Sequence, residues 1–221
     1  MSGFLAAPMP WMSVPELLQG RPLVVIAPHP DDETLGCGAL VFDAVAAGVA
    51  TSVICVTDGS RSHPGSASHP PARLTTLRRR EMEAATATLG ATLHWLGHPD
   101  CAVDETADIG PLIPQGALVL ASWEGDPHCD HESVARMAKA ALRPDLALAF
   151  YPVWGRFGDR QAEGARRLRA SPEARAAKAR ALACHASQMT RLIADDPSGF
   201  VMEDWRQAHF LEHPEIIIAA P

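Results

Sequence analysis

Two short polar motifs, far apart in the sequence, carry side chains suited to binding a metal and moving protons. The first is His29-Pro30-Asp31-Asp32, followed directly by Glu33, and the second is His128-Cys129-Asp130-His131. Catalytic zinc sites commonly use three protein ligands drawn from histidine, carboxylate and cysteine side chains, and leave a fourth position for water. One histidine and one aspartate from the first motif, with one histidine from the second, would supply such a set.

The adjacent carboxylates of Asp31, Asp32 and Glu33 need a reason to stand together, because like charges this close repel and raise one another's pKa. A bound cation would favour the ionised forms and remove the repulsion. Neighbouring residues at a turn point in different directions, so one aspartate can bind the metal while the other faces the water. The alternative is that these aspartates, and Asp126 or Asp130 in the second motif, only cap helices, whose N-terminal dipoles favour acidic groups.

Short apolar runs alternate with amphipathic segments along the chain. Strands are predicted at 22–27, 51–57, 91–96, 116–123, 146–154 and 215–219, and helices at 33–48, 73–90, 131–142 and 172–191. Strands that are apolar throughout are typical of a parallel sheet covered by helices on both faces, so an α/β fold is expected.

Each polar motif follows a predicted strand. Numbering the first five strands in chain order, an order of 3-2-1-4-5 would place the strands at 22–27 and 116–123 side by side. Their carboxyl ends would then flank the topological switch point, where open α/β sheets bind ligands. Two motifs that each follow a strand favour the metal interpretation over two unrelated helix caps.

Composition excludes several other classes of protein. The 221 residues suffice for one large domain, and the net charge of −7 argues against a nucleic-acid binder, which needs a basic face. No apolar stretch approaches membrane-spanning length, and the first twenty residues lack the basic region of a signal peptide. Five scattered cysteines without a C-x-x-C pair argue against a disulfide framework, so we expect a reduced, cytoplasmic protein.

The sequence resembles the LmbE-like, or PIG-L, family of zinc-dependent N-deacetylases. The resemblance is carried by APHPDDETLGCGA at 27–39 together with HCDH at 128–131. Further matches follow in order: TDG at 57–59, RRREMEAATATLG at 78–90, LGHPD at 96–100 and KARALACHASQ at 178–188. The fold implied is a Rossmann-like three-layer sandwich with a mostly parallel sheet. We expect one such domain at 22–221, preceded by an N-terminal extension at 1–21.

The resemblance also implies roles for the residues of both motifs. His29, Asp32 and His131 would be the metal ligands, and Asp31 the general base that takes a proton from zinc-bound water. His128 would be a protonated partner that stabilises the oxyanion or protonates the leaving amine. Asp130 would orient a neighbouring histidine, as carboxylates behind a metal ligand commonly do.

The implied reaction is removal of an acetyl group from an N-acetylglucosamine-type amino sugar or glycoconjugate. Zinc is the expected metal, although histidine and carboxylate ligands also admit Fe²⁺, Co²⁺ or Mn²⁺. The alternatives are hydrolysis of another small amide on the same centre, and a metal-binding or sugar-binding domain without catalysis. A small-molecule substrate is the expected partner, without nucleic acid or a membrane span, and a homo-oligomer stays open.

Some residues keep two interpretations. The resemblance implies that Arg78 and Asp100 contact the substrate, whereas a charged helix surface is the simplest interpretation of Arg78. Lys178, His185 and Gln188 fall at helical spacing and either support the site or tie a helix edge to loops. Cys129 could be a fourth ligand, but its side chain should project away from those of its neighbours. GCGALV at 36–41 is a poor dinucleotide fingerprint and favours close helix–sheet packing.

One departure from the family concerns a tyrosine that some members place two residues before the first histidine of H-x-D-H. Asp126 stands there, and the single tyrosine of this chain is Tyr151. What takes over from that tyrosine is not evident in the sequence, and neither are the group attached to the sugar and the native metal.

Overall fold

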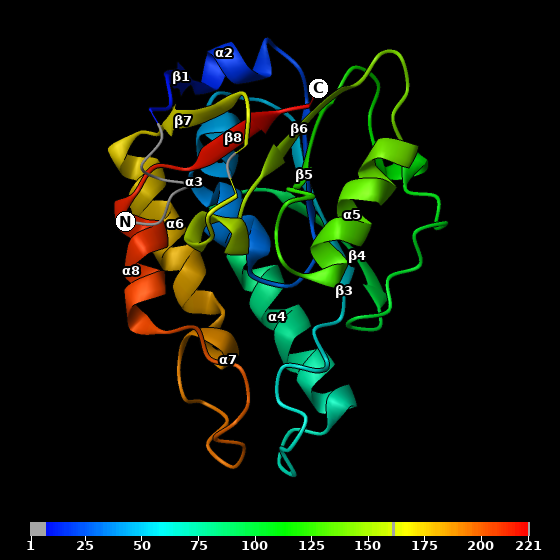
Figure 1. Ribbon diagram of the computed structural model, residues 1–221, viewed down its shortest axis with the longest axis vertical. Helices are drawn as coiled ribbons and strands as arrows, with labels where there is room; N and C mark the ends of the chain where they lie inside the picture. The colour runs from blue at the N-terminus through cyan, green and yellow to red at the C-terminus, as the bar shows by residue number, and fades with distance from the viewer. Residues whose placement is uncertain (1–7, 161, 221) are drawn as a thin grey trace.

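A computed structural model describes residues 8–160 and 162–220. Eight strands form one sheet in the order β1-β7-β8-β6-β5-β2-β3-β4 (Figure 1). The strands are β1 (Trp11–Ser13), β2 (Leu23–Ala27), β3 (Thr51–Thr57), β4 (Thr92–His98), β5 (Leu118–Ser122), β6 (Ala147–Tyr151), β7 (Ala165–Arg169) and β8 (Ile216–Ala219). The main helices are α3 (Asp32–Ala46), α4 (Pro71–Leu89), α5 (Cys129–Ala140), α6 (Pro172–Cys184) and α8 (Asp204–Glu212).

The order of the central strands confirms the prediction. The first five predicted strands correspond to β2, β3, β4, β5 and β6. They lie side by side in the order β4-β3-β2-β5-β6, which is the predicted order 3-2-1-4-5, and each neighbouring pair is parallel. β8 runs antiparallel to β6 and β7, which makes the sheet mixed but mostly parallel. Because β2 and β5 are neighbours, the segments that follow them start at the same edge of the sheet.

Helices cover both faces of the sheet, as predicted for a three-layer α/β sandwich (Figure 1). Side chains alternate along each strand, so Val25 and Ala27 face one core and Val24 and Ile26 face the other. The first core includes α3, α4 and α6, and the second is covered by α5. β2 is buried along its whole length, which explains its unbroken apolar sequence.

The glycine-rich start of α3 packs closely on the sheet. A Cβ at Gly36 would lie 2.2 Å from the ring of Tyr151 on β6, and the Tyr151 hydroxyl donates a 2.9 Å hydrogen bond to the Ile26 carbonyl on β2. At Gly38 a Cβ would lie 3.1 Å from the Lys178 side chain of α6. These contacts confirm that the glycines of GCGALV serve helix packing, and they fix where α3 begins relative to β2.

Other expectations need correction. The helix predicted over 172–191 ends at Cys184, and a separate short helix, α7 (Ala186–Met189), follows. β1, β7 and α8 were not predicted, and neither was the short helix α2 (Val14–Leu18). β1 pairs with β7, so part of the N-terminal extension belongs to the main sheet, whereas its first seven residues lie outside the described part of the chain. No helix among the described residues is long and apolar enough to cross a membrane.

Candidate metal centre

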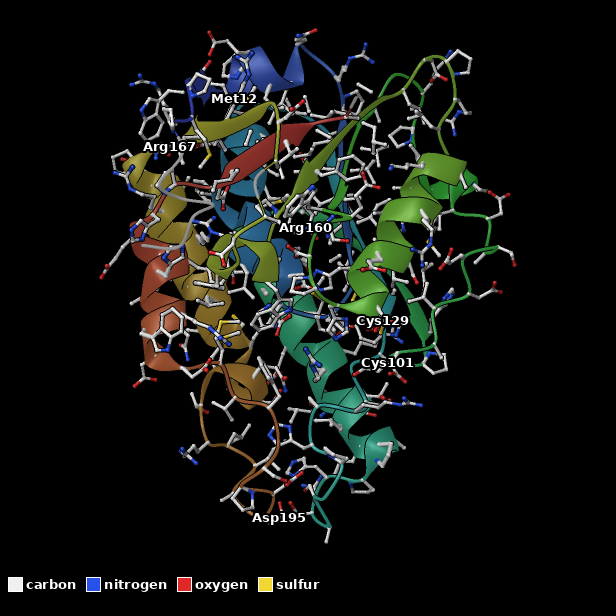
Figure 2. The ribbon with its side chains drawn as sticks, in the orientation of Figure 1. Met12, Cys101, Cys129, Arg160, Arg167 and Asp195 are labelled. Atoms are coloured by element: carbon white, nitrogen blue, oxygen red, sulfur yellow. The ribbon has the colours of Figure 1, made fainter. Side chains whose placement is uncertain are left out.

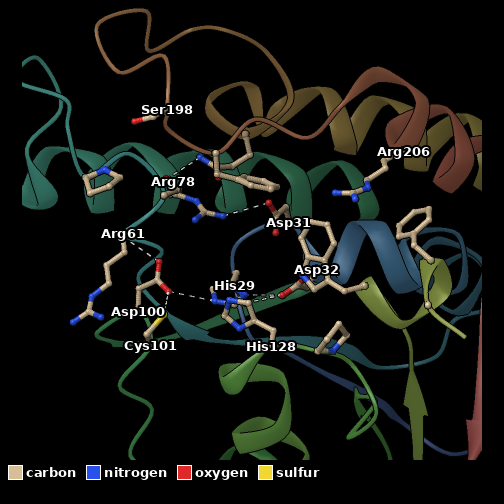
Figure 3. Close-up of a pocket in the computed structure, with 18 residues that line it drawn as sticks. His29, Asp31, Asp32, Arg61, Arg78, Asp100, Cys101, His128, Ser198 and Arg206 are labelled. Atoms are coloured by element: carbon tan, nitrogen blue, oxygen red, sulfur yellow. Dashed lines mark hydrogen bonds and ion pairs between the residues drawn. The ribbon is translucent and has the colours of Figure 1, made fainter. Parts of the chain in front are cut away.

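The two polar motifs meet at the carboxyl ends of β2 and β5, at the floor of a cavity of about 780 Å³ (Figure 3). Segments from distant parts of the chain form its walls, including a loop at 61–64, a short helical turn at 154–158 and the region 198–206 that leads into α8. The lining residues include His29, Asp31, Asp32, Arg61, Arg78, Asp100, His128, Trp154, Phe157, Gln188, Phe200 and Arg206.

One carboxylate oxygen lies between two imidazoles at this floor. Asp32 Oδ2 is 3.1 Å from His29 Nδ1 and 3.2 Å from His131 Nε2. The strand–turn–helix geometry positions these groups, because His29 ends the β2 loop, Asp32 opens α3 and His131 lies in the first turn of α5. The structure thus brings together the three residues predicted as metal ligands.

The hydrogen bonds of His131 leave one nitrogen turned toward this point. Its Nδ1 bonds the Asp126 carboxylate at 2.9 Å, so that nitrogen carries the ring proton of the neutral imidazole. The other nitrogen, Nε2, is buried and faces Asp32 Oδ2 at 3.2 Å, without a well-directed hydrogen bond in the described part of the chain. A divalent ion between this nitrogen and the carboxylate would bind both, which fits the role of His131 as a metal ligand.

His29 is held in the same manner. Its Nε2 bonds Asp130 Oδ2 at 3.0 Å and lies 3.4 Å from Asp100 Oδ1, so a proton on Nε2 leaves the Nδ1 lone pair facing Asp32. Asp130 Oδ2 also accepts the Cys101 backbone N–H at 2.9 Å, which fixes the carboxylate. A donor set of two imidazole nitrogens and one carboxylate fits a divalent metal of the zinc type.

The charges around the two imidazoles favour a cation. Burial lowers the pKa of His29, but its hydrogen bonds with Asp100, Asp130 and Asp32 outweigh burial and hold the pKa well above its ordinary value. Burial likewise lowers the pKa of His131, while the charge of Asp32 and the bond with Asp126 raise it to about 9. Burial disfavours the Asp32 carboxylate, yet His131 and His29 lower its pKa overall. Positive charge is therefore stabilised at this point.

Asp31 lies beside this group in an unusual backbone conformation. Its φ of 141° and ψ of −27° are rarely adopted by residues with a side chain. The Asp31 backbone N–H donates to Glu33 Oε2 at 3.1 Å, and the Arg78 guanidinium bonds both Asp31 Oδ2 at 3.3 Å and the Pro30 carbonyl at 2.8 Å. Burial raises the pKa of Asp31 to about 7, although Arg78 opposes this shift.

His128 caps α5 and presents its ring to the cavity. Its Nδ1 accepts the Asp130 backbone N–H at 3.2 Å, so the neutral ring carries its proton on Nε2. Burial and the neighbouring His29 and His131 lower the pKa of His128. A neutral hydrogen-bond donor is favoured here, which differs from the protonated His128 expected from the sequence.

The predicted substrate residues have more partners than expected. Arg78 is 3% exposed, and besides Asp31 and Pro30 it bonds the Gly59 carbonyl at 3.1 Å. Gly59 has a φ of 61°, and a Cβ there would overlap the guanidinium, so glycine is required for this approach. Asp100 lines the cavity, and its Oδ2 accepts the Arg61 backbone N–H at 3.1 Å.

Lys178, His185 and Gln188, which kept two interpretations in the sequence, lie close to the metal centre without belonging to it. His185 Nε2 bonds Glu33 Oε1 at 3.2 Å, and Lys178 bonds Glu215 at 2.8 Å and the Leu35 carbonyl at 2.7 Å. Gln188 alone reaches the cavity wall, where its Nε2 donates to Ser62 Oγ at 3.1 Å. The first two residues therefore hold the start of α3, on which Asp31 and Asp32 depend.

Sequence reasoning missed the contact of Asp126, the residue that stands where some relatives have tyrosine. Asp126 is fully buried, and besides His131 it accepts backbone N–H groups of Val153, Trp154 and Gly155 at 2.8, 3.2 and 2.7 Å. The sequence signal for this contact was its position, five residues before His131.

The wall of the cavity that α7 and α8 form was also not predicted, because no sequence pattern indicated α8.

Comparison with known proteins gives consistent results. A family model described as PIG-L, GlcNAc-PI de-N-acetylase, matches residues 24–142. The chain is 32% identical to the mycothiol S-conjugate amidase of Streptomyces coelicolor over 106 residues, which are 44% of this chain and 35% of that protein. It is 28% identical to a 1D-myo-inositol 2-acetamido-2-deoxy-alpha-D-glucopyranoside deacetylase of Catenulispora acidiphila over 143 residues, 61% of this chain and 45% of that protein. The chain thus spans less than half the length of these two relatives.

The fold matches solved structures over most of the chain. The structure of a triple mutant of a deacetylase in the teicoplanin biosynthetic pathway superposes with a TM-score of 0.68 at 20% identity. That match covers 90% of this chain and 97% of the other, and shows that the two share a fold.

Proposed function

The chain belongs to the PIG-L family, and from this premise we propose that it is a metal-dependent hydrolase that removes an acetyl group from an N-acetylglucosamine-type amino sugar. The observation that supports this most directly is the position of Asp32 Oδ2, 3.1 Å from His29 Nδ1 and 3.2 Å from His131 Nε2, with the Asp31 carboxyl buried next to them. The relative from Catenulispora is named for a deacetylase of an acetamido-glucopyranoside, which suggests the substrate class.

His29, Asp32 and His131 would hold the metal, and zinc suits this donor set. A bound divalent ion would lower the pKa of water to about 7 and polarise the amide carbonyl. Asp126 and Asp130 fix the ring orientation of the two histidine ligands through the hydrogen bonds described above. Neither carboxylate needs to touch the substrate, so both are positioning residues.

Asp31 is suited to move the proton in hydrolysis of the amide C–N bond. Its raised pKa, about 7, lets the carboxylate take a proton from the attacking water and then return it to the departing amine nitrogen. Arg78 and Glu33 hold the carboxyl and its strained backbone in place. We propose this double role for Asp31 because the neutral His128 is poorly suited to donate a full proton.

His128 would stabilise the oxyanion instead. Its Nε2 carries the proton of the neutral ring, and the ring lines the cavity. A hydrogen bond from this N–H to developing negative charge is typical of oxyanion stabilisation, and such a donor contributes about 10²–10³ to kcat in other hydrolases. It would also take over the role of the tyrosine that some family members have.

Asp100 and Arg78 line the cavity where the sugar would bind, and Asp100 is the better placed of the two to accept a hydrogen bond from a sugar hydroxyl.

A screen for acetate release tests the proposed function. The metal-free protein would be loaded with one equivalent of Zn²⁺, Fe²⁺, Co²⁺ or Mn²⁺ and incubated with a panel of N-acetylglucosaminyl compounds, with chelator-treated protein as the control. We expect acetate from at least one compound and none from the control. If none of the four metals supports acetate release from any compound, hydrolysis is contradicted and a metal-binding or sugar-binding domain is favoured.

A further inference from the structure

A second group of potential metal ligands lies at the edge of the candidate metal centre. One ligand atom each of Cys101, His128 and Asp130 lies within 4.8 Å of the other two. Cys101 follows β4 and His128 caps α5, so the group joins two separate elements. Its chemistry differs from that of the first centre, because it contains sulfur.

A second thiol, that of Cys129, lies beside these three ligand atoms. Cys129 Sγ lies 3.9 Å from Asp130 Oδ1, and its thiol interacts with that of Cys101. Figure 2 labels the two cysteines next to each other, below the N-terminal end of α5. Both residues are exposed, so ions in solution can reach them. The expectation that Cys129 points away from its neighbours is therefore not met for Asp130.

The two oxygens of Asp130 have different partners. Asp130 Oδ2 is occupied by His29 and by the Cys101 backbone N–H, whereas Oδ1 faces Cys129. Asp100 adds charge nearby, because its Oδ1 lies 3.6 Å from Cys101 Sγ. Two carboxylates beside two thiols attract a cation and favour loss of the thiol protons once it binds.

The spacing suits a tetrahedral ion after a small adjustment. Zinc binds sulfur at about 2.3 Å and nitrogen or oxygen at about 2.0–2.2 Å, which places tetrahedral ligands roughly 3.3–3.8 Å apart. The atoms of Cys101, His128 and Asp130 lie within 4.8 Å of one another, so they need to approach by about 1.0–1.5 Å at most. Exposed thiol side chains can make such a movement by changing rotamer.

We propose that Cys101, Cys129, His128 and Asp130 form a second site, for a thiophilic divalent ion such as Zn²⁺, whose occupation inhibits the enzyme. On binding, the two thiols release their protons to solvent. The ring proton of His128 moves through solvent from Nε2 to Nδ1, which breaks the hydrogen bond from the Asp130 backbone N–H. The two sulfur atoms, His128 Nε2 and Asp130 Oδ1 then bind the ion. The inhibitory part rests on the proposed function, since the ion would occupy His128 Nε2 and remove this hydrogen-bond donor from the oxyanion. A protein with one metal would be active and a protein with two would not.

The binding part can be tested without any activity. Metal-free protein, kept reduced by a phosphine that does not chelate, would be titrated with Co²⁺ while the near-ultraviolet sulfur-to-cobalt charge-transfer absorption is recorded. We expect this absorption in the wild type and a total of two ions bound per chain. The variant carrying Cys101→Ser and Cys129→Ser should lose the absorption and bind one ion, whereas Cys184→Ser, a matched control on α6, should behave as the wild type. Absence of the absorption in the wild type, or its survival in the double variant, would overturn the site.

The inhibitory part needs a second measurement. Acetate release would be compared at one equivalent of Zn²⁺ and at a tenfold excess, each protein serving as its own reference. Excess zinc should inhibit the wild type and Cys184→Ser at least tenfold more than the double cysteine variant. Equal inhibition of all three proteins would overturn the regulatory role. If no substrate is turned over, the cobalt absorption still decides whether the site exists, so the two proposals fail independently.

Discussion

Asp126 lies outside both sequence motifs, yet it controls the orientation of a proposed metal ligand. Its Oδ2 accepts the His131 ring N–H and the backbone N–H groups of Val153 and Trp154, and its Oδ1 accepts that of Gly155. Every one of these partners is a donor. Only a carboxylate, which offers two acceptor oxygens and no hydrogen, satisfies all of them.

Asp126→Asn should therefore weaken metal binding by about 10–100-fold, because the amide NH₂ would face a donor and loosen the His131 ring. Metal affinity can be measured by competition with a chromophoric chelator. Asp145→Asn is the matched control, since Asp145 also accepts a backbone N–H, from Gly116 at 2.8 Å, away from the site. An unchanged affinity in Asp126→Asn would show that this contact does not hold the ligand.

Asp31→Asn should lower kcat/KM by at least about 10²-fold while metal content stays at the wild-type level, because the amide cannot accept the proton of water. Asp32→Asn provides the contrast, since it should lose the metal as well. Steady-state kinetics and elemental analysis of the same preparations separate the two. Turnover by Asp31→Asn near the wild-type rate would exclude Asp31 as the base.

The buried pair of His185 and Glu33 predicts a pH dependence of stability. Burial lowers the pKa of His185, but Glu33 outweighs burial and raises it above the ordinary value of 6.5. A raised histidine pKa contributes stability that is fully present below the ordinary pKa and is lost as pH rises through the raised one. The difference in unfolding free energy between wild type and His185→Gln should thus be larger at pH 6 than at pH 9, as measured by urea denaturation. A difference that grows with pH would contradict the pairing.

The residue types of the site were predictable from the two motifs, and so was the contact of Asp130 with a histidine, but the contact of Asp126 was not. The strand order brings the two loops together, and the family resemblance then singles out His29, Asp32 and His131 as the ligands. The partner carboxylates depend on side-chain directions at turns, so Asp126 was considered only as a helix cap and the cap of α5 is in fact His128. The protonation of His128 depends on surrounding charges that spacing does not show.

The start of α3 depends on how closely the helix approaches the sheet. Gly36 leaves room for the Tyr151 ring, and the Tyr151 hydroxyl ties β6 to β2. This contact sets the distance between α3 and the sheet next to β2, the strand that leads into the metal centre. A side chain at position 36 would push the helix away from β6 or displace a fully buried tyrosine.

Gly36→Ala should destabilise the fold by about 1–3 kcal/mol, the usual cost of overpacking a core. The added methyl would lie 2.2 Å from the Tyr151 ring, whereas a Cβ at Gly158 would meet its nearest neighbour at 3.7 Å. Gly158→Ala is therefore the control, and both free energies can be measured by denaturant unfolding. Equal stability of both variants and the wild type would mean that the ring moves at little cost.

Strands that are buried throughout were predicted well, and the short strand β7, with alternating burial, was missed. β2, β3 and β5 are largely buried on both faces and read as apolar runs. β7 has the sequence ARRLR, because its arginines extend toward solvent, and nothing in the sequence separates it from a basic helix surface. The break between α6 and α7 was missed because KARALACHASQ keeps helical spacing across it.

The candidate centre joins segments that the chain keeps far apart. His29 and Asp32 follow β2, His131 lies on α5 after β5, and β2 pairs with β5 in parallel. A metal would therefore act as a cross-link over a large chain separation, binding the folded state and not the unfolded one.

Metal removal should lower the thermal midpoint of the whole domain. At a free metal concentration about 1,000 times Kd, binding contributes about 4 kcal/mol to the unfolding free energy. Chelator treatment should remove this contribution, and adding one equivalent of metal should restore it, as measured by differential scanning calorimetry. The Asp32→Asn variant should show no response to either step. A midpoint that is identical with and without metal would contradict a bound ion at this site.

The position of β8 has a consequence for biosynthesis. β8 is the last strand in the described chain, yet it lies inside the sheet, between β6 and β7. A ribosome delivers β2 to β6, which pair with one another, well before β8 emerges, and until then β7 and β1 have no route into the sheet. Glu215, just before β8, also accepts the backbone N–H groups of Ala39 and Leu40 in α3. The nascent chain must therefore wait until β8 has emerged before β7 and β1 can join the sheet.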